Sequence, residues 1–230
     1  MKDIIHRITQ QIGLEYLSLD KNLDFAYYEE KDDFFLLLFY NYQDLMKVTN
    51  DHLQDLEYAL NTIVVNTKKS EELLQLNERN INYNLSLILF VALDDENPEL
   101  LQEFNKVEEN YINAKKYILP YQANALEQLK SKMGENGNII QVLNNLAMSH
   151  SDDIQNVDKK WYDLLLNLFI KIPFLNYQST DHTLAITSLA NSIDEILTER
   201  EAFLLSNLKD ENIAIIGDIE SFARQKKMIE

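Results

Sequence analysis

The chain has 230 residues, of which 46% are hydrophobic; it contains no cysteine and carries a formal net charge of −17 at pH 7. This composition is typical of a globular protein with a sizeable core, and it excludes disulfide scaffolds, thiolate metal sites and cysteine nucleophiles. Acidic residues outnumber basic ones by 22 to 11 in residues 1–120 and by 16 to 10 in residues 121–230. Neither half therefore resembles an independent nucleic-acid-binding domain, which needs a positive patch to neutralise phosphates.

The amino-terminal part is expected to combine a helix with a β-hairpin. Apolar residues recur at helical spacing over residues 3–14, and Gly13 is expected to end that helix. Residues 23–28 read as a strand, and the uninterrupted apolar run of residues 34–40 reads as a second strand covered on both faces. The charged residues between the two runs predict the hairpin turn.

Helical spacing returns over residues 41–65, and residues 82–93 predict a third strand. The acidic cluster and proline of residues 94–98 are typical of a helix start. We expect that helix to extend to Leu119 and to be ended by Pro120.

After Tyr121 the sequence predicts only helices, over residues 124–133, 139–147, 157–172, 183–197 and 210–228. The expected fold class is therefore α+β, with a small, mostly antiparallel sheet and flanking helices followed by an all-helical C-terminal region. The expected organisation is a mixed α/β region over residues 1–121 and a helical region over residues 122–230. Because the composition does not change abruptly between them, one continuous domain stays an alternative.

The sequence predicts a cytoplasmic protein. The first seven residues, Met1–Arg7, include an acid and lack an apolar run of signal-peptide length. The longest uncharged apolar stretch, Asn80 to Leu93, is too short to span a bilayer and is expected to be buried.

Motifs for enzymatic chemistry are weak in this sequence. Gly134 and Gly137 form its only close glycine pair, and they lack the preceding strand and the GK[ST] sequence of a phosphate-binding loop. The four histidines are far apart and form neither an HExxH motif nor an i, i+4 pair. We therefore predict no catalytic residue, no metal and no cofactor.

One enzymatic alternative stays open. Nucleases of the PD-(D/E)xK type hold a divalent metal ion with an acid and a D/E-x-K pair on successive strands. Glu29-Glu30-Lys31 contains an E-x-K triplet at the end of a predicted strand, and Asp20 or Asp24 would supply the upstream acid. Such triplets arise readily by chance in a chain with 38 acidic residues.

Residues 106–121, KVEENYINAKKYILPY, are harder to explain as generic sequence. Tyr111, Tyr117 and Tyr121 are amphipathic anchors suited to an interface. The alternative is that they seal the joint between the two regions of the chain.

The string EENYINAKKYILPY, from Glu108 to Tyr121, resembles the signature of the middle-component proteins of ABC three-component systems, the Lamassu-type anti-phage defences. These proteins carry a glutamate-rich stretch followed by a K-K-Y-[VI]-L-x-Y ending. The order of predicted elements is also similar, and the resemblance covers roughly residues 20–125. Asn113-Ala114 departs from the pattern, because an aromatic residue often precedes KKY in the family.

The resemblance implies a non-catalytic adaptor in a hetero-oligomeric complex, bridging an SMC-like coiled-coil ABC ATPase and an effector that is often a nuclease. DNA would be contacted only through that complex. The residues expected to bind a partner are Tyr111, Lys115, Lys116, Tyr117 and Tyr121. A metal-dependent or degenerate nuclease is the alternative function.

Overall fold

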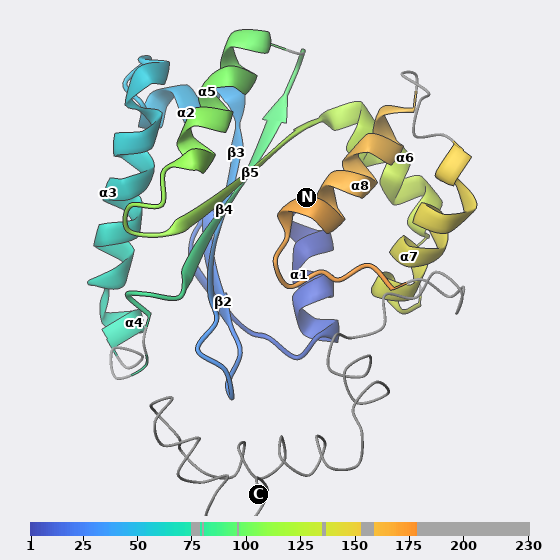
Figure 1. Ribbon diagram of the computed structural model, residues 1–230, viewed down its shortest axis with the longest axis horizontal. Coiled ribbons are helices and arrows are strands. Elements are labelled where there is room, and N and C mark those ends of the chain that lie inside the picture. The colour runs from blue at the N-terminus through green and yellow to red at the C-terminus, as the bar shows by residue number, and fades with distance from the viewer. Residues whose placement is uncertain (75–78, 80, 96, 135–136, 153–158, 179–230) are drawn as a thin grey trace, which may run out of the picture. The chain divides into compact units, whose positions relative to one another are not determined.

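Five strands form one mixed sheet in the order β1-β2-β3-β4-β5 (Figure 1). The computed structural model describes residues 1–74, 79, 81–95, 97–134, 137–152 and 159–178. Its strands are β1 (Glu15–Asp20), β2 (Leu23–Tyr27), β3 (Phe34–Asn41), β4 (Leu85–Leu93) and β5 (Lys115–Gln122). The pairs β1–β2 and β2–β3 are antiparallel, whereas β3–β4 and β4–β5 are parallel.

Helices cover both faces of this sheet (Figure 1). One face carries α2 (Tyr42–Val48), the 3₁₀ turn η1 (Leu53–Asp55), α3 (Leu56–Lys68), α4 (Glu71–Leu74) and α5 (Pro98–Glu109). The other face carries α1 (Lys2–Gln11), α6 (Ala123–Met133), α7 (Ile139–Ser149) and α8 (Lys160–Lys171). The predicted α+β class, with a small sheet and flanking helices, is confirmed, but the sheet is mixed and not mostly antiparallel, because β4 and β5 pair in parallel after helical crossovers. The predicted helices over residues 183–197 and 210–228 lie outside the described residues.

Burial explains why the sequence predicts the strands β3 and β4. Residues 34–38 of β3 are all buried, and so are residues 87–91 of β4. Both strands lie inside the sheet with helices on each face, so both of their side-chain faces must be apolar. The edge strand β1, EYLSLD, is largely exposed and has no such run. It was not predicted for that reason.

The single helix expected over residues 41–65 is wrong. Helix α2 ends at Val48, and the chain then turns through Asn50 and Asp51, whose φ angles are 50° and 62°. Asn and Asp tolerate this left-handed conformation better than other side-chain-bearing residues. The backbone therefore breaks here, before η1 and α3 resume the helical spacing.

The helix expected to run from residue 98 to Leu119 is also wrong. Helix α5 ends at Glu109, and residues 115–122 form β5, paired in parallel with β4 along eight positions. The helix ends because Asn110 is extended, with φ −94° and ψ 113°, and Asn113, with a φ angle of 66°, lies in the turn that leads into β5. Proline is tolerated in β5 because the strand is at the edge of the sheet.

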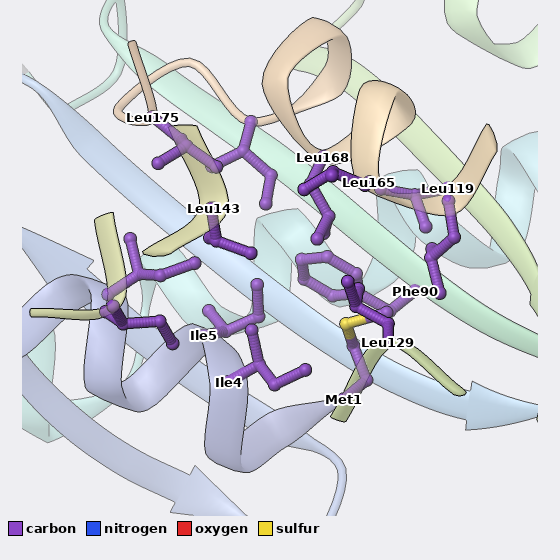
Figure 2. Packing of buried hydrophobic residues seen from close by; sticks show 14 of the residues in the cluster. Met1, Ile4, Ile5, Phe90, Leu119, Leu129, Leu143, Leu165, Leu168 and Leu175 are labelled. Carbon is purple, nitrogen blue, oxygen red and sulfur yellow. The ribbon is translucent and has the colours of Figure 1, made fainter. Parts of the chain in front are cut away.

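The helices after β5 share a core with α1 and the sheet. Figure 2 shows Ile4 and Ile5 of α1, Leu129 of α6 and Leu168 of α8 gathered around Phe90 of β4. Residues 1–178 form one compact unit. None of the helices in the described part of the chain is long and apolar enough to cross a membrane.

Candidate functional site

Within the segment that resembles the middle-component signature, residues 110–114 form a tight turn around a buried lysine. Lys116 is only 2% exposed. Its ammonium donates hydrogen bonds to the carbonyl oxygens of Asn110 at 2.7 Å and of Ile112 at 2.9 Å. Burial lowers the pKa of Lys116, and the negative charge of Glu57 opposes this shift. Because Lys116 fills the inside of the turn, the turn carbonyls are satisfied without water.

Helix α3 holds the same turn from outside. The ammonium of Lys68 donates to the carbonyl of Asn113 at 2.8 Å and to that of Asn82 at 3.4 Å. The side-chain amide of Asn110 donates to the carboxylate of Glu57. These bonds tie the turn before β5 to α3 and to the residues before β4.

This support leaves an apolar tip in solvent. Tyr111 is 67% exposed and Ile112 is 60% exposed, whereas the following Ala114 is buried. A large aromatic side chain on a braced turn loses little conformational entropy when it binds a partner. The geometry of this tip is therefore suited to an interface.

Glu108 closes the outer edge of β5. Its carboxylate accepts a hydrogen bond from the backbone N–H of Ile118 at 2.6 Å and pairs with the ammonium of Lys171 in α8 at 2.6 Å. Pro120, two residues further along the same edge, has no N–H to offer. Unpaired N–H groups at a sheet edge invite pairing with another chain, so this arrangement protects β5 from edge-to-edge association.

The five predicted partner-binding residues do not form one surface. Tyr117 and Tyr121 both point to the face of the sheet that α6 and α8 cover, and both are half-buried there. Lys116 points to the opposite face. Lys115 is exposed, with its ammonium 5.1 Å from the ring centroid of Tyr117. Tyr111 lies in the turn, before the strand begins.

Tyr121 reaches a cavity of about 480 Å³ at the carboxyl ends of β4 and β5. Asp95 follows β4, and Asp163 and Asn167 belong to α8; all three line the same cavity. Burial raises the pKa of Tyr121. No pattern in the sequence connects Asp95 with Asp163, because only the packing of α8 beside the sheet brings them to one cavity.

The residues considered for nuclease chemistry are separated in the structure. Glu29, Glu30 and Lys31 are exposed in the loop between β2 and β3. Asp24 lies on β2 and is completely buried. Among the described residues, no group of three or more His, Asp or Glu side chains could hold a metal ion.

Asp24 is surrounded by donors instead. Its carboxylate accepts hydrogen bonds from the ammonium of Lys2 at 2.8 Å, from the hydroxyl of Ser18 at 2.9 Å and from the hydroxyl of Tyr16. Lys2 comes from α1, and Ser18 and Tyr16 come from β1. This polar cluster fastens α1 to the edge of the sheet.

Alkaline unfolding tests this cluster. Burial and the hydrogen bond to Asp24 raise the pKa of Tyr16, so the folded protein keeps a proton that the unfolded chain loses at about pH 10. The free energy of unfolding must therefore fall above about pH 10, by up to about 1.4 kcal/mol per pH unit for each such tyrosine. Urea unfolding between pH 8 and pH 11 should show a shallower fall for Tyr16→Phe than for the wild type.

Tyr121→Phe is the matched comparison, because burial alone raises the pKa of Tyr121. This variant should reduce the alkaline slope without the loss at pH 7 that Tyr16→Phe suffers from its missing hydrogen bond. Equal slopes for Tyr16→Phe and the wild type would contradict the assignment of Tyr16 to the Asp24 cluster.

No protein-family model, curated protein or solved structure matches the chain. What the chain does must therefore be argued from its residues and their geometry.

Proposed function

We propose that the chain is a non-catalytic adaptor in a cytoplasmic anti-phage defence complex, where it bridges an SMC-like coiled-coil ABC ATPase and an effector, often a nuclease. The observation that carries the proposal is the exposed Tyr111–Ile112 tip, which lies within the segment that resembles the middle-component signature. Tyrosine is enriched among the few residues that supply most of the energy of an interface.

The bonding around the tip supports a binding role over a purely structural one. Lys116, Lys68 and Glu57 brace the backbone of the turn, so the fold does not need the side chain of Tyr111 for its stability. A side chain that is held out on a braced turn and contributes little to its own core is available to a partner.

Alanine at Tyr111 tests the proposal. Tyr111→Ala is expected to leave the free energy of unfolding within about 0.5 kcal/mol of wild type. It should weaken binding to the ATPase by about 2 kcal/mol, or roughly 30-fold, as measured by calorimetry on the purified pair. Circular dichroism checks that the variant is folded.

The matched control is Tyr177→Ala, which removes another exposed tyrosine, 48% exposed, from the layer of α6–α8. It should leave the affinity for the ATPase unchanged. The proposal of a binding tip fails if the two alanine variants bind equally well, or if Tyr111→Ala unfolds the chain.

A metal-dependent or degenerate nuclease is the second candidate, and the observation for it is that Asp24 lies on a strand of the sheet. Asp24 lies on β2 opposite Leu37 of β3, so an acid stands on one of two successive strands. The positions on β3 that could complete the metal site on this face are Leu37 and Phe39, both apolar. Magnesium- or manganese-dependent cleavage of plasmid DNA by the pure protein, abolished by Glu29→Gln, would favour an active nuclease over the adaptor.

A further inference from the structure

The connections that leave the carboxyl ends of β4 and β5 diverge at one point of the sheet, although the strand order does not reverse there. The chain leaves β4 into α5 on one face of the sheet and leaves β5 into α6 on the other face (Figure 1). In sheets with parallel strands, ligands bind in the crevice outside the carboxyl ends at such a point, because the two connections diverge there. The cavity of about 480 Å³ lies at this place, lined by Leu93 and Asp95 after β4 and by Tyr121 and Gln122 at the end of β5.

The walls of this cavity are amphipathic. Leu93, Leu101, Pro120 and Leu164 give it an apolar lining from four different elements. A volume of several hundred Å³, a mainly apolar wall and a few polar groups are the usual properties of small-ligand sites.

Two carboxylates are among the polar groups of the lining, the exposed Asp95 after β4 and the partly exposed Asp163 on α8. Neither has a hydrogen bond or an ion pair with any residue in the described part of the chain. Lys160 also lines the cavity, and it is not free, because it has an interaction of its own. The cavity therefore offers two negatively charged hydrogen-bond acceptors beside an apolar surface.

We propose that this cavity binds a ligand with an apolar body and one positively charged group, an amine, an amidine or a guanidinium. The apolar body would displace water from the leucine side chains, and the cation would make charge-assisted hydrogen bonds to Asp95 and Asp163. The same chemistry is available from a free small molecule or from an arginine side chain of a protein segment. This inference does not depend on the adaptor proposal.

Three probes of one shape test the charge requirement on the full chain: phenethylamine, phenethyl alcohol and 3-phenylpropionate. The amine is expected to bind with a Kd about tenfold lower than the alcohol, as one charge-assisted hydrogen bond would give, and the anion is expected to bind weakest. Calorimetry or ligand-observed NMR measures the three constants.

Matched variants locate the site. Asp95→Asn and Asp163→Asn keep the shape of the side chain and should each reduce the preference for the amine, while the double variant should abolish it. Glu127→Gln is the control, because it removes an exposed acid of the neighbouring α6 outside the cavity. It should leave the tenfold preference intact.

Two dipeptides identify the source of the cation. Acetyl-Leu-Arg-amide binding more tightly than phenethylamine, and more tightly than its citrulline analogue, would assign the site to a partner's arginine, whereas the reverse order would assign it to a free amine. The proposal is overturned if no probe binds, if the alcohol binds as tightly as the amine, or if the double variant keeps the preference. Binding of the ATPase by the double variant then reports separately on the adaptor proposal.

Discussion

Asp24→Asn is expected to lower the free energy of unfolding by about 2–3 kcal/mol at pH 7, because a buried carboxylate loses its hydrogen bonds while the ammonium of Lys2, whose side chain is 38% exposed, keeps part of its hydration. The carboxylate of Asp24 accepts three hydrogen bonds and is fully buried. An amide in its place carries no charge to balance the ammonium of Lys2, and its NH₂ group replaces one of the two oxygens that now accept hydrogen bonds. Urea unfolding followed by circular dichroism gives the change directly.

Asp20→Asn is the matched control, because Asp20 is an exposed acid at the end of β1. It should change the free energy of unfolding by less than about 0.5 kcal/mol. A double-mutant cycle with Lys2→Met should then show strong coupling between Lys2 and Asp24.

The change in stability caused by Asp24→Asn also separates two roles of Asp24, an anchor for α1 and a residue needed for DNA cleavage. Asp24 stabilises the fold if it serves mainly to anchor α1. The anchor role of Asp24 would be wrong if Asp24→Asn left the protein equally stable or made it more stable while abolishing metal-dependent DNA cleavage.

The interior of the sheet could be predicted from the sequence because burial on both faces leaves a local signal. β3 contains the apolar run of residues 34–40 and β4 that of residues 87–93, and runs of this length bounded by polar residues are typical of strands. β1 left no signal, since a six-residue edge strand with four exposed positions resembles a polar loop.

The strand β5 was misread for a different reason. Its residues follow α5 after only five residues, and lysines and isoleucine fit a helix as readily as a strand. What decides the outcome is pairing with β4 and the bonds from Lys116 back to the turn, and these are tertiary contacts. Local propensity is a weak prior that such contacts override.

The candidate site residues also differ in whether the sequence alone indicates their position. Tyr111 was predicted to bind a partner, and the structure places it in solvent. Its role in binding stays a prediction. Lys116 was expected to face a partner and instead lies inside the turn. A buried lysine and an exposed one look alike in sequence, because the difference depends on which carbonyls surround the side chain after folding.

Lys116→Met is expected to lower the free energy of unfolding by about 3 kcal/mol, because several carbonyls that now accept from the ammonium would be left buried without a donor. The methionine keeps an apolar stem of comparable length, so the loss reports on the ammonium and not on packing. Hydrogen exchange should show the loss concentrated in residues 110–114, the turn that Lys116 braces. Urea unfolding gives its total size.

Lys115→Met removes the same charge from the exposed neighbour and should change the free energy of unfolding by less than about 0.5 kcal/mol.

The pair of variants also tests whether the hydrogen bonds of Lys116 to the turn matter for function. If the tip binds through a pre-formed turn, Lys116→Met should weaken binding of the ATPase although Tyr111 is unchanged, since ordering the turn would then cost free energy during binding. Lys115→Met should bind like the wild type. Equal stability of the two variants would show that the carbonyls of the turn find other donors and that Lys116 does not hold the tip.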